Sequence, residues 1–222
     1  MNVSAIITAA GQNRRMREDL KKRGLPLKNK LILEIKGKPL LQHTIQSVLN
    51  VPVDECIVVV GHYQDEILPA ISNIKDPRLK IIKNNPVDVP LAQSLYHGLK
   101  SASGNICLCV AGDQPTVKSN SLRKLKDKII NSDNQDNMVS ILGRKTYGRL
   151  DSAEGLGMPF ASSRNLLLHY LPHYKSNLNP MLRRMLKEGV EFYGFPPENK
   201  QELININQYR DYELILNDFK EE

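Results

Sequence analysis

Short apolar runs rich in β-branched residues alternate with longer segments of helical periodicity along the first 130 residues of this chain. We expect the apolar runs to form buried strands; they cover residues 3–8, 56–61, 79–83 and 106–111. The segments with helical spacing cover residues 40–49, 65–74, 91–102 and 121–130. Because this alternation is typical of βαβ units, the pattern predicts an α/β fold with a parallel sheet.

The second part of the chain is less regular. Residues 138–143 and 190–195 are candidate strands, and residues 164–171, 181–188 and 209–216 are candidate helices. The polar stretch at residues 131–137 has the composition of a loop rather than of a linker between domains. We therefore expect one domain over residues 1–222, with a sheet that is mixed rather than wholly parallel.

The charge of the chain points to an acidic partner. A formal net charge of +7 suits a phosphorylated metabolite or a nucleic acid. Seven cations crowd one early segment: Lys21, Lys22, Arg23, Lys28, Lys30, Lys36 and Lys38. No aromatic residues interleave with them, as a stacking platform for nucleic acid would require, and a solvated basic surface is the simpler interpretation for residues 21–23. We expect no nucleic-acid partner.

Other features indicate a cytoplasmic protein without a membrane partner. No stretch approaches the roughly 18 apolar residues of a membrane span, and the N-terminus resembles a first strand rather than a signal peptide. The three cysteines, Cys56, Cys107 and Cys109, form no CxxC motif. We expect them to be reduced and packed in the core.

Small and charged residues follow two of the predicted strands. In an open α/β sheet, ligands bind beyond the carboxyl ends of the strands. Residues 8–16, TAAGQNRRM, follow the first strand and combine small residues with two arginines that can bind phosphate oxygens. Residues 112–115, GDQP, follow the fourth strand. The first loop matches neither the GxxxxGK[ST] nor the GxGxxG pattern, so by itself it indicates a polyphosphate site only weakly.

Four motifs in chain order make the sequence similar to a known family. TAAGQNRRM, KLILEIKGKPLL at residues 30–41, VVVGH at residues 58–62 and GDQP resemble the nucleotidyltransferases of the molybdopterin group, above all the molybdenum cofactor cytidylyltransferases. The likeness spans nearly the whole chain. It implies a three-layer α/β/α sandwich with a Rossmann-like, mostly parallel mixed sheet, of the nucleotide-diphospho-sugar transferase type. A nucleotide-binding half would cover about residues 1–115, and an acceptor-binding half about residues 116–222.

The resemblance implies a set of nucleotide-binding residues. They are Thr8, Ala9, Ala10, Gly11, Arg15, Lys30 and Ser94. Arg15, beside Met16, would bind the triphosphate, and Lys30 would be the second phosphate-binding cation. Residues 17–29 form a longer connection than the family has, so Lys28 is an alternative to Lys30, because alternation along a strand would point both to one side. Ser94 could instead have a purely structural role, as a capping residue in the first turn of its helix. Ala10, where the guanosine-specific members have glycine, favours CTP over GTP.

Asp113 is the strongest candidate catalytic residue, together with Arg15 and Lys30. A carboxylate at the end of a strand suits Mg²⁺, which prefers hard oxygen ligands beside substrate phosphates, with Mn²⁺ as an alternative metal. The second metal ligand should come from residues 202–213, ELININQYRDYE. Asn207 is our choice, although Asn205 and Asn207 stand where the cytidylyltransferases commonly have aspartates. The structural alternative for Asn207 is a helix N-cap.

The acceptor side is less well marked. By resemblance, Gln114, Gly157 and Pro159 would contact the acceptor, but Met158 replaces a residue that is usually polar in the family. His169 and His173 are four apart, and Pro172 interrupts the helix that would align them as metal ligands. No pattern indicates a covalent mechanism.

The predicted function is a Mg²⁺-dependent transfer of CMP from CTP to a phosphorylated acceptor, with release of pyrophosphate. By resemblance the acceptor is molybdopterin or its molybdenum-loaded form, and a molybdenum hydroxylase would receive the product. Two alternatives stay open: transfer to a sugar, polyol or choline phosphate, and a non-catalytic protein that binds and delivers the cofactor. A basic nucleic-acid-binding protein has only the lysine cluster in its favour.

Overall fold

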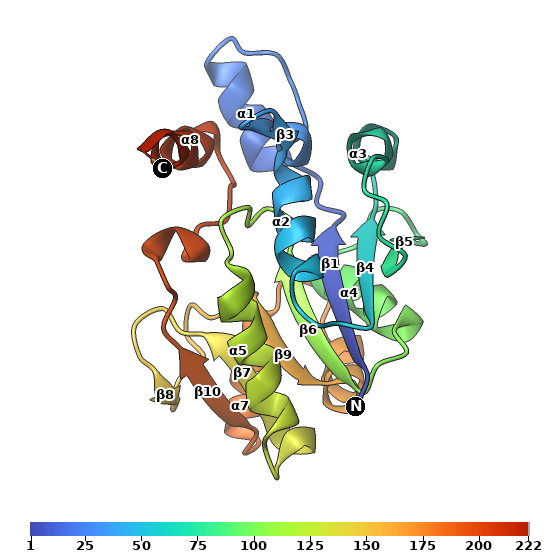
Figure 1. Cartoon of the computed structure of the whole chain (residues 1–222), viewed down its shortest axis with the longest axis vertical. Coiled ribbons are helices and arrows are strands. Elements are labelled where there is room, and N and C mark those ends of the chain that lie inside the picture. Colours follow the sequence, from blue (N-terminus) through green and yellow to red (C-terminus); the bar gives the residue numbers. More distant parts are fainter. Residues whose placement is uncertain (222) are drawn as a thin grey trace.

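The computed structural model describes residues 1–221, and an eight-stranded sheet runs through their centre (Figure 1). The order of the strands is β5-β4-β1-β6-β9-β7-β10-β8. Their bounds are β1 Val3–Ala9, β4 Glu55–Val60, β5 Leu79–Lys83, β6 Ile106–Ala111, β7 Met138–Leu142, β8 Gly148–Arg149, β9 Phe160–Ser163 and β10 Glu191–Phe195. The sheet therefore joins strands from both predicted halves of the chain.

Most of the sheet is parallel. β4 pairs with β1 and β5, β1 with β6, and β7 with β10 in parallel register, whereas β9 runs antiparallel between β6 and β7, and β8 is antiparallel to β10. Two antiparallel pairings in succession make β7 point the same way as β6. The carboxyl ends of β1, β6 and β7 thus meet at one edge of the sheet, and the prediction of a mostly parallel mixed sheet is confirmed.

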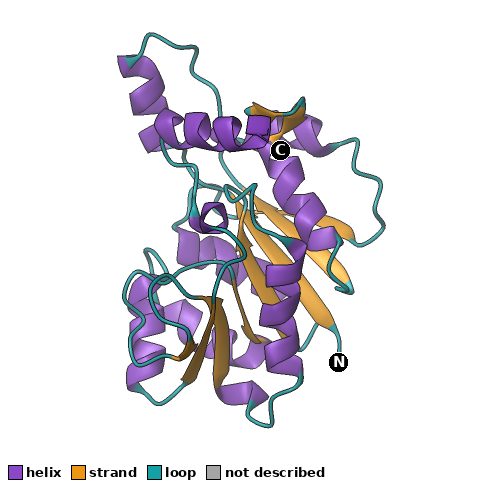
Figure 2. Cartoon of the chain, turned by 60° about the vertical axis from the view of Figure 1, so that its left-hand side comes forward, coloured by secondary structure: helices purple, strands orange, loops and turns teal. Residues whose placement is uncertain are grey.

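Helices cover both faces of the sheet, which gives three layers (Figure 2). The helices are α1 Arg14–Lys22, α2 Leu40–Leu49, α3 Gln64–Ile71, α4 Leu91–Ser101, α5 Ser119–Ile130, α6 Arg164–Tyr170, α7 Asn179–Lys187 and α8 Tyr209–Glu221. Residues of α1, α2, α3, α5 and α8 share one apolar core, and those of α4, α6 and α7 share the other. Successive strand residues face opposite cores, as Ile6 and Ile7 of β1 do.

The prediction missed three local features. α1 begins directly at Arg14, within the segment expected to be a loop, and buries only Met16 and Leu20, which are four residues apart on one helical face. Residues Lys30–Ile32 form a 3₁₀ turn rather than a strand, and a two-stranded hairpin of β2 (Glu34–Ile35) and β3 (Lys38–Pro39) follows it. β9 gave little periodic signal because it is only four residues long and buried throughout.

All three cysteines lie in the core, as predicted. Burial raises the pKa of Cys56 and of Cys107 to about 12, and it raises the pKa of Cys109 well above its ordinary value. These thiols stay protonated and are packing residues. Among the residues that the structure describes, no helix has the length and apolar character needed to cross a membrane.

Candidate active site

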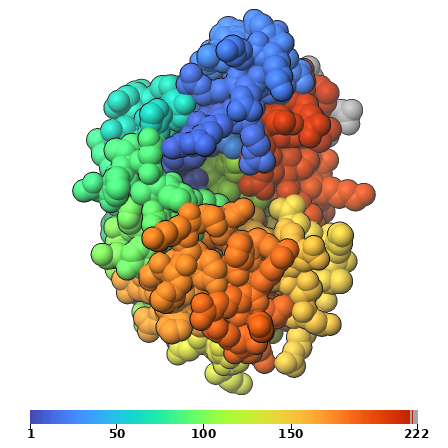
Figure 3. Space-filling model, turned by 180° about the vertical axis from the view of Figure 1, so that it is seen from behind, coloured from blue at the N-terminus to red at the C-terminus, as the bar shows by residue number. Residues whose placement is uncertain are grey.

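A cavity of about 870 Å³ opens at the sheet edge where β1, β6 and β7 end. In Figure 3 its opening is the hollow between the blue N-terminal segment, the red C-terminal segment and the orange segment of the second half. Most residues of the predicted site line it: Thr8, Ala9, Ala10, Gly11, Arg15, Lys30, Ser94, Asp113, Gly157 and Asn207. The fold thus brings together side chains that are far apart along the chain.

The N-terminus of α1 supplies positive charge to this cavity. Arg14 and Arg15 occupy its first turn, where free backbone N–H groups and the helix dipole favour an anion. Two arginines in that turn, with no acidic residue, are unfavourable for the helix by themselves, so the arrangement suits an anionic ligand. Arg15 lines the cavity and donates from Nη2 to Asn207 Oδ1 at 2.9 Å. Arg14 instead lines a separate hollow beside Arg17 and Tyr63.

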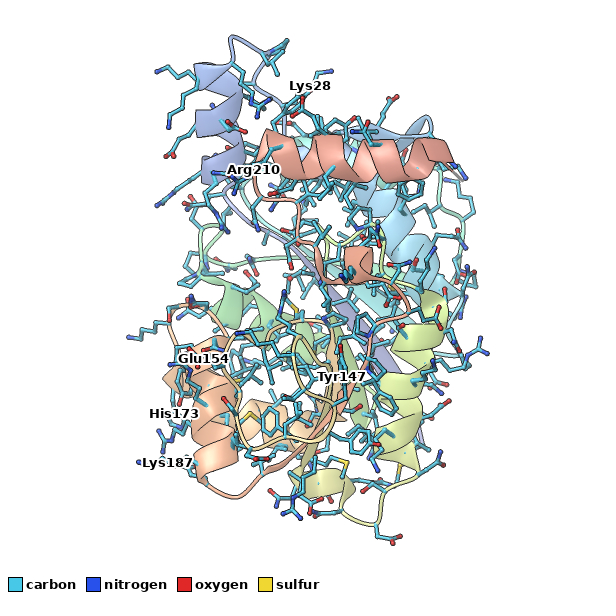
Figure 4. All side chains as sticks on the ribbon, turned by 90° about the vertical axis from the view of Figure 1, so that its left-hand side faces the viewer. Lys28, Tyr147, Glu154, His173, Lys187 and Arg210 are labelled. Carbon is cyan, nitrogen blue, oxygen red and sulfur yellow. The ribbon has the colours of Figure 1, made fainter. Side chains whose placement is uncertain are left out.

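Lys30, and not Lys28, faces the cavity. The side chain of Asn13 donates to the carbonyl of Lys28 at 2.9 Å and accepts from the backbone N–H of Lys30 at 3.4 Å, which ties this turn to the start of α1. Asn13 itself has a left-handed backbone with φ of 57°. Lys28 is exposed and lies at the top of the molecule in Figure 4. The assumed strand alternation is wrong here, because residues 28–30 are a loop entering a 3₁₀ turn.

Asp113 is held at the end of β6 by close backbone packing. The N–H of Gly112 donates to the carbonyl of Thr8 at 2.9 Å, and Thr44 Oγ1 donates to the carbonyl of Gly112 at 3.1 Å. A Cβ at Gly112 would lie 3.0 Å from that Thr8 oxygen and 3.1 Å from Leu41 Cδ1, so glycine permits this approach. The carboxylate is therefore presented to the cavity by a rigid turn between two parallel strands.

Lys30 and the C-terminal segment surround the carboxylate of Asp113. Lys30 Nζ lies 2.5 Å from Asp113 Oδ2 and 2.7 Å from the carbonyl oxygen of Ile206, with Asn207 Oδ1 at 3.5 Å. Asn205 Nδ2 donates to Asp113 Oδ1 at 2.9 Å. The backbone N–H of Ile206 also donates to the carbonyl of Asp113 at 3.0 Å. One carboxylate, two amides and two cations, Lys30 and Arg15, thus form a single cluster.

Asn207 does not cap α8. Instead, Asp211 Oδ2 in the first turn accepts from the backbone N–H groups of the two residues before the helix, Asn207 at 2.9 Å and Gln208 at 2.8 Å. The Asn207 amide group is left to accept from Arg15 and to donate to the carbonyl of Asn205 at 3.2 Å. Its side chain is therefore directed into the cluster.

The oxygens of this cluster are of the kind that Mg²⁺ binds. Mg²⁺ commonly takes one or two carboxylates together with substrate phosphates, and Asp113 with Asn207 fits such a partial set. In this structure these oxygens accept hydrogen bonds from Lys30, Arg15 and Asn205. The residues fit a metal that would enter with a phosphorylated substrate and would replace these hydrogen-bond donors as the partner of the two oxygens.

Ala10 and Ser94 lie on an uncharged part of the cavity wall. Ala10 is 7% exposed, and a Cβ at Gly61 would lie 2.9 Å from the Cβ of Ala10, so the loops after β1 and β4 are in close contact. Ser94 is buried in the first turns of α4 and accepts from Asn84 Nδ2 at 2.9 Å. The Oδ1 of Asn84 in turn contacts His97 Nδ1 at 2.9 Å. This chain of side chains holds the hydroxyl of Ser94 in place at the cavity wall.

The residues predicted to contact the acceptor are placed differently. Gly157 lines the cavity, whereas Gln114 and Pro159 are buried outside its lining. Gln114 Nε2 donates to the carbonyl of Met158 at 3.1 Å, so the side chain holds the loop that carries Gly157. Met158 lines the cavity, and its Sδ accepts a weak 3.9 Å hydrogen bond from Thr8.

Sequence reasoning missed three charged residues that line the cavity: Arg144, Glu154 and Arg183. Arg144 follows β7 by two residues, so the rule that ligands bind at the carboxyl ends of strands would have found it. Arg183 lies on α7, and only the tertiary structure brings that helix to the cavity. Arg144 is exposed overall, but the protein around its guanidinium partly desolvates that group and lowers its pKa below the ordinary value.

An open α/β sheet with a cationic helix N-terminus and a carboxylate at the carboxyl ends of its strands is typical of nucleotide-binding α/β proteins. The model of the MobA-like NTP transferase domain matches residues 5–192, and the chain belongs to this nucleotidyltransferase family.

Known proteins resemble the chain to different extents. A nucleotidyl transferase from Methanothermobacter thermautotroptrophicus is 42% identical, with a TM-score of 0.92 over 99% of this chain and 98% of that one. The 2-C-methyl-D-erythritol 4-phosphate cytidylyltransferase of Photobacterium profundum is 24% identical over 96% of this chain and 94% of its own length. The bifunctional protein GlmU of Syntrophomonas wolfei is 30% identical over 57% of this chain, and the match spans only 26% of that longer protein.

Proposed function

We propose that this protein transfers a nucleoside monophosphate from a nucleoside triphosphate to a phosphorylated acceptor and releases pyrophosphate. One observation carries the proposal: Lys30, Asp113, Asn207 and Arg15 form a continuous cluster on the wall of one large cavity. Family membership supports it. The cluster contains the charges that phosphoryl-type transfer requires, because such chemistry depends mainly on positioning and electrostatic stabilisation.

The residues of the cluster have separate tasks. Arg15 and the N–H groups of the first turn of α1 bind the triphosphate. Lys30 neutralises charge that develops on the departing pyrophosphate. A phosphate oxygen of the acceptor attacks the α-phosphorus in line, and the bond from that phosphorus to the oxygen bridging to the β-phosphate breaks, so the electron pair leaves with pyrophosphate. The attacking oxygen is already ionised, and no general base is needed.

Asp113 and Asn207 would hold Mg²⁺, or Mn²⁺ in its place. Bound there, the metal would supply charge neutralisation for the phosphate oxygens. The identity of these ligands rests on the oxygen donors of the cluster and on the family resemblance of the GDQP turn.

CTP is the nucleotide that we propose. Ala10 lines the cavity, and its Cβ packs against Gly61 of the loop after β4, which would leave more room for a one-ring base than for a two-ring base. The relative from Photobacterium profundum is itself named a cytidylyltransferase.

Two acceptor classes follow from different observations. The resemblance of the TAAG and GDQP motifs to molybdenum cofactor cytidylyltransferases supports molybdopterin, with a molybdenum hydroxylase as recipient of the product. The match to 2-C-methyl-D-erythritol 4-phosphate cytidylyltransferase over 96% of the chain supports a polyol or sugar phosphate instead. Both acceptors carry a phosphate monoester, and the chemistry at the α-phosphorus is the same.

The test is a transfer assay with [α-³²P]CTP, Mg²⁺ and one acceptor at a time: molybdopterin, a polyol phosphate, a sugar phosphate or choline phosphate. Labelled product and released pyrophosphate should appear together with one acceptor, and Asp113→Asn should abolish both. GTP in place of CTP is the nucleotide control. Nucleotide binding without pyrophosphate release for any acceptor would contradict the proposal and favour a binding or delivery protein.

A further inference from the structure

Two arginines of the second half of the chain enter the same cavity as the reactive cluster. Arg144 follows the carboxyl end of β7, and Arg183 lies on the cavity side of α7. Neither has a strong anionic partner. Among the side chains that the structure describes, Arg144 makes no ion pair and donates only to the carbonyl of Leu203 at 3.3 Å. Arg183 Nη2 lies 3.9 Å from Glu154 Oε1.

The pairing of Arg183 with Glu154 is weak. Their side chains are 58% and 83% exposed, and ion pairs this exposed contribute little because water screens them. A phosphate dianion carries more charge than a carboxylate and can accept two parallel N–H bonds from one guanidinium. An incoming phosphate would therefore replace Glu154 as the partner of Arg183.

The charges that line the cavity leave an excess of cations. Its lining holds Arg15, Lys30, Arg144 and Arg183 against Asp113 and Glu154. In the proposed reaction the triphosphate would occupy Arg15 and Lys30, and Asp113 would hold the metal. A second anionic group entering the cavity would meet the negative charge of the bound nucleotide, and Arg144 and Arg183 are the cations placed to offset that repulsion.

We propose that Arg144 and Arg183 form the binding site for the phosphate monoester of the acceptor. The proposal rests on the proposed nucleotidyl transfer and assigns the acceptor phosphate to two binding residues that lie outside the motifs of the sequence.

The experiment uses glycerol 3-phosphate as a simple phosphate monoester, with glycerol as the uncharged control. Binding is followed by the concentration-dependent ³¹P line broadening of glycerol 3-phosphate, with and without saturating α,β-methylene CTP, which cannot be turned over. Binding of the nucleotide analogue is measured separately by calorimetry. We expect the wild-type protein to bind the phosphate monoester saturably while the analogue is bound.

Each variant has a neighbouring control. Arg144→Ala and Arg183→Ala should raise the dissociation constant of glycerol 3-phosphate at least tenfold and leave binding of the analogue unchanged. Lys145→Ala and Arg184→Ala remove neighbouring cations that do not line the cavity. They should change neither the binding of glycerol 3-phosphate nor the binding of the analogue. Glu154→Gln should tighten phosphate binding about twofold to fivefold, because it removes the competing carboxylate.

The outcomes separate the two proposals. Suppose that the wild type binds the analogue. The arginine site is then overturned, and nucleotidyl transfer is unaffected, if the wild type does not bind glycerol 3-phosphate. The same holds if Arg144→Ala and Arg183→Ala bind glycerol 3-phosphate as well as their controls do. If the analogue does not bind the wild type while phosphate binding still depends on both arginines, the proposed function fails and the phosphate site stands.

Discussion

Lys30 Nζ lies 2.5 Å from Asp113 Oδ2, although 83 residues separate the two along the chain. Both side chains are 15% exposed, so the pair is largely shielded from water. The contact joins the turn after α1 to the end of β6, and the carbonyl of Ile206 adds the C-terminal segment to it. The charge cluster proposed for catalysis therefore also connects three parts of the chain, and its removal should affect both activity and stability.

Asp113→Asn should reduce kcat more than tenfold, because the variant loses the negative charge proposed to hold the metal. It should also lower the free energy of unfolding by about 1–3 kcal/mol, since a mostly buried Lys30 loses its partner. Transfer assays and urea unfolding measure the two effects. The double variant Lys30→Met with Asp113→Asn should recover part of the stability and none of the activity. Retention of more than about a tenth of the wild-type kcat in Asp113→Asn would refute the assignment.

Arg15→Ala should weaken CTP binding and lower the rate, whereas Arg14→Ala should have a milder effect, because only Arg15 lines the main cavity. The two side chains are adjacent in the first turn of α1, so each variant controls for the other. Arg15→Lys should restore only part of the loss, since an ammonium cannot reproduce the bidentate geometry of guanidinium. Steady-state kinetics with CTP decide this, and equal losses in both alanine variants would contradict it.

Ala10→Gly should narrow the preference for CTP over GTP without abolishing activity. Removing the Cβ of Ala10 would open space between the loops after β1 and β4 at the side of the cavity, and one methyl group in a tight pocket is worth on the order of 1–3 kcal/mol of discrimination. The ratio of kcat/KM for CTP and GTP in a competition assay measures the change. A wild-type preference for GTP would contradict the choice of nucleotide, and an unchanged ratio in the variant would place selectivity elsewhere, for example at Ser94.

Glu55 should make stability depend on acidic pH. Burial would raise the pKa of this carboxyl, but hydrogen bonds from Lys80, Ser103 and Ser4 outweigh it and lower the pKa from 4.5 to about 2. Because the pKa is lower in the folded protein, the stabilisation is complete above about pH 5 and is lost as the pH falls toward 2. It is on the order of 3 kcal/mol at neutral pH.

Chemical unfolding between pH 7 and pH 2.5 measures this effect. Glu55→Gln should lower the free energy of unfolding at pH 7 and flatten its decline with falling pH. Glu66→Gln changes an exposed carboxyl on α3 and should keep the wild-type pH dependence. An identical decline in the wild type and Glu55→Gln would show that Glu55 is not the group responsible.

Much of the fold could be predicted because its local signals are strong. The strands at β1, β4 and β6 are largely apolar runs, and burial on both faces of a parallel sheet selects such runs, whereas β5, expected to be buried, is a partly exposed edge strand with two lysines. Both ends of α2 were predicted correctly. Its apolar spacing begins directly after Pro39, and a proline disfavours helical structure in the residues before it. β9 could not be predicted in this way, since four residues carry too little periodicity and the pairing between β6 and β7 defines the strand.

The sequence by itself determined the α/β alternation and placed Arg15 and Asp113 at the ends of the first and fourth strands, because strand order along the chain sets which residues follow each strand. Only the tertiary structure decided that Lys30 rather than Lys28 meets Asp113, because Asn13 fixes the turn through contacts that no local pattern encodes. It likewise brought Arg183 into the cavity. Side-chain direction in a loop depends on long-range contacts, whereas the position of a strand depends on the hydrophobicity of its own residues.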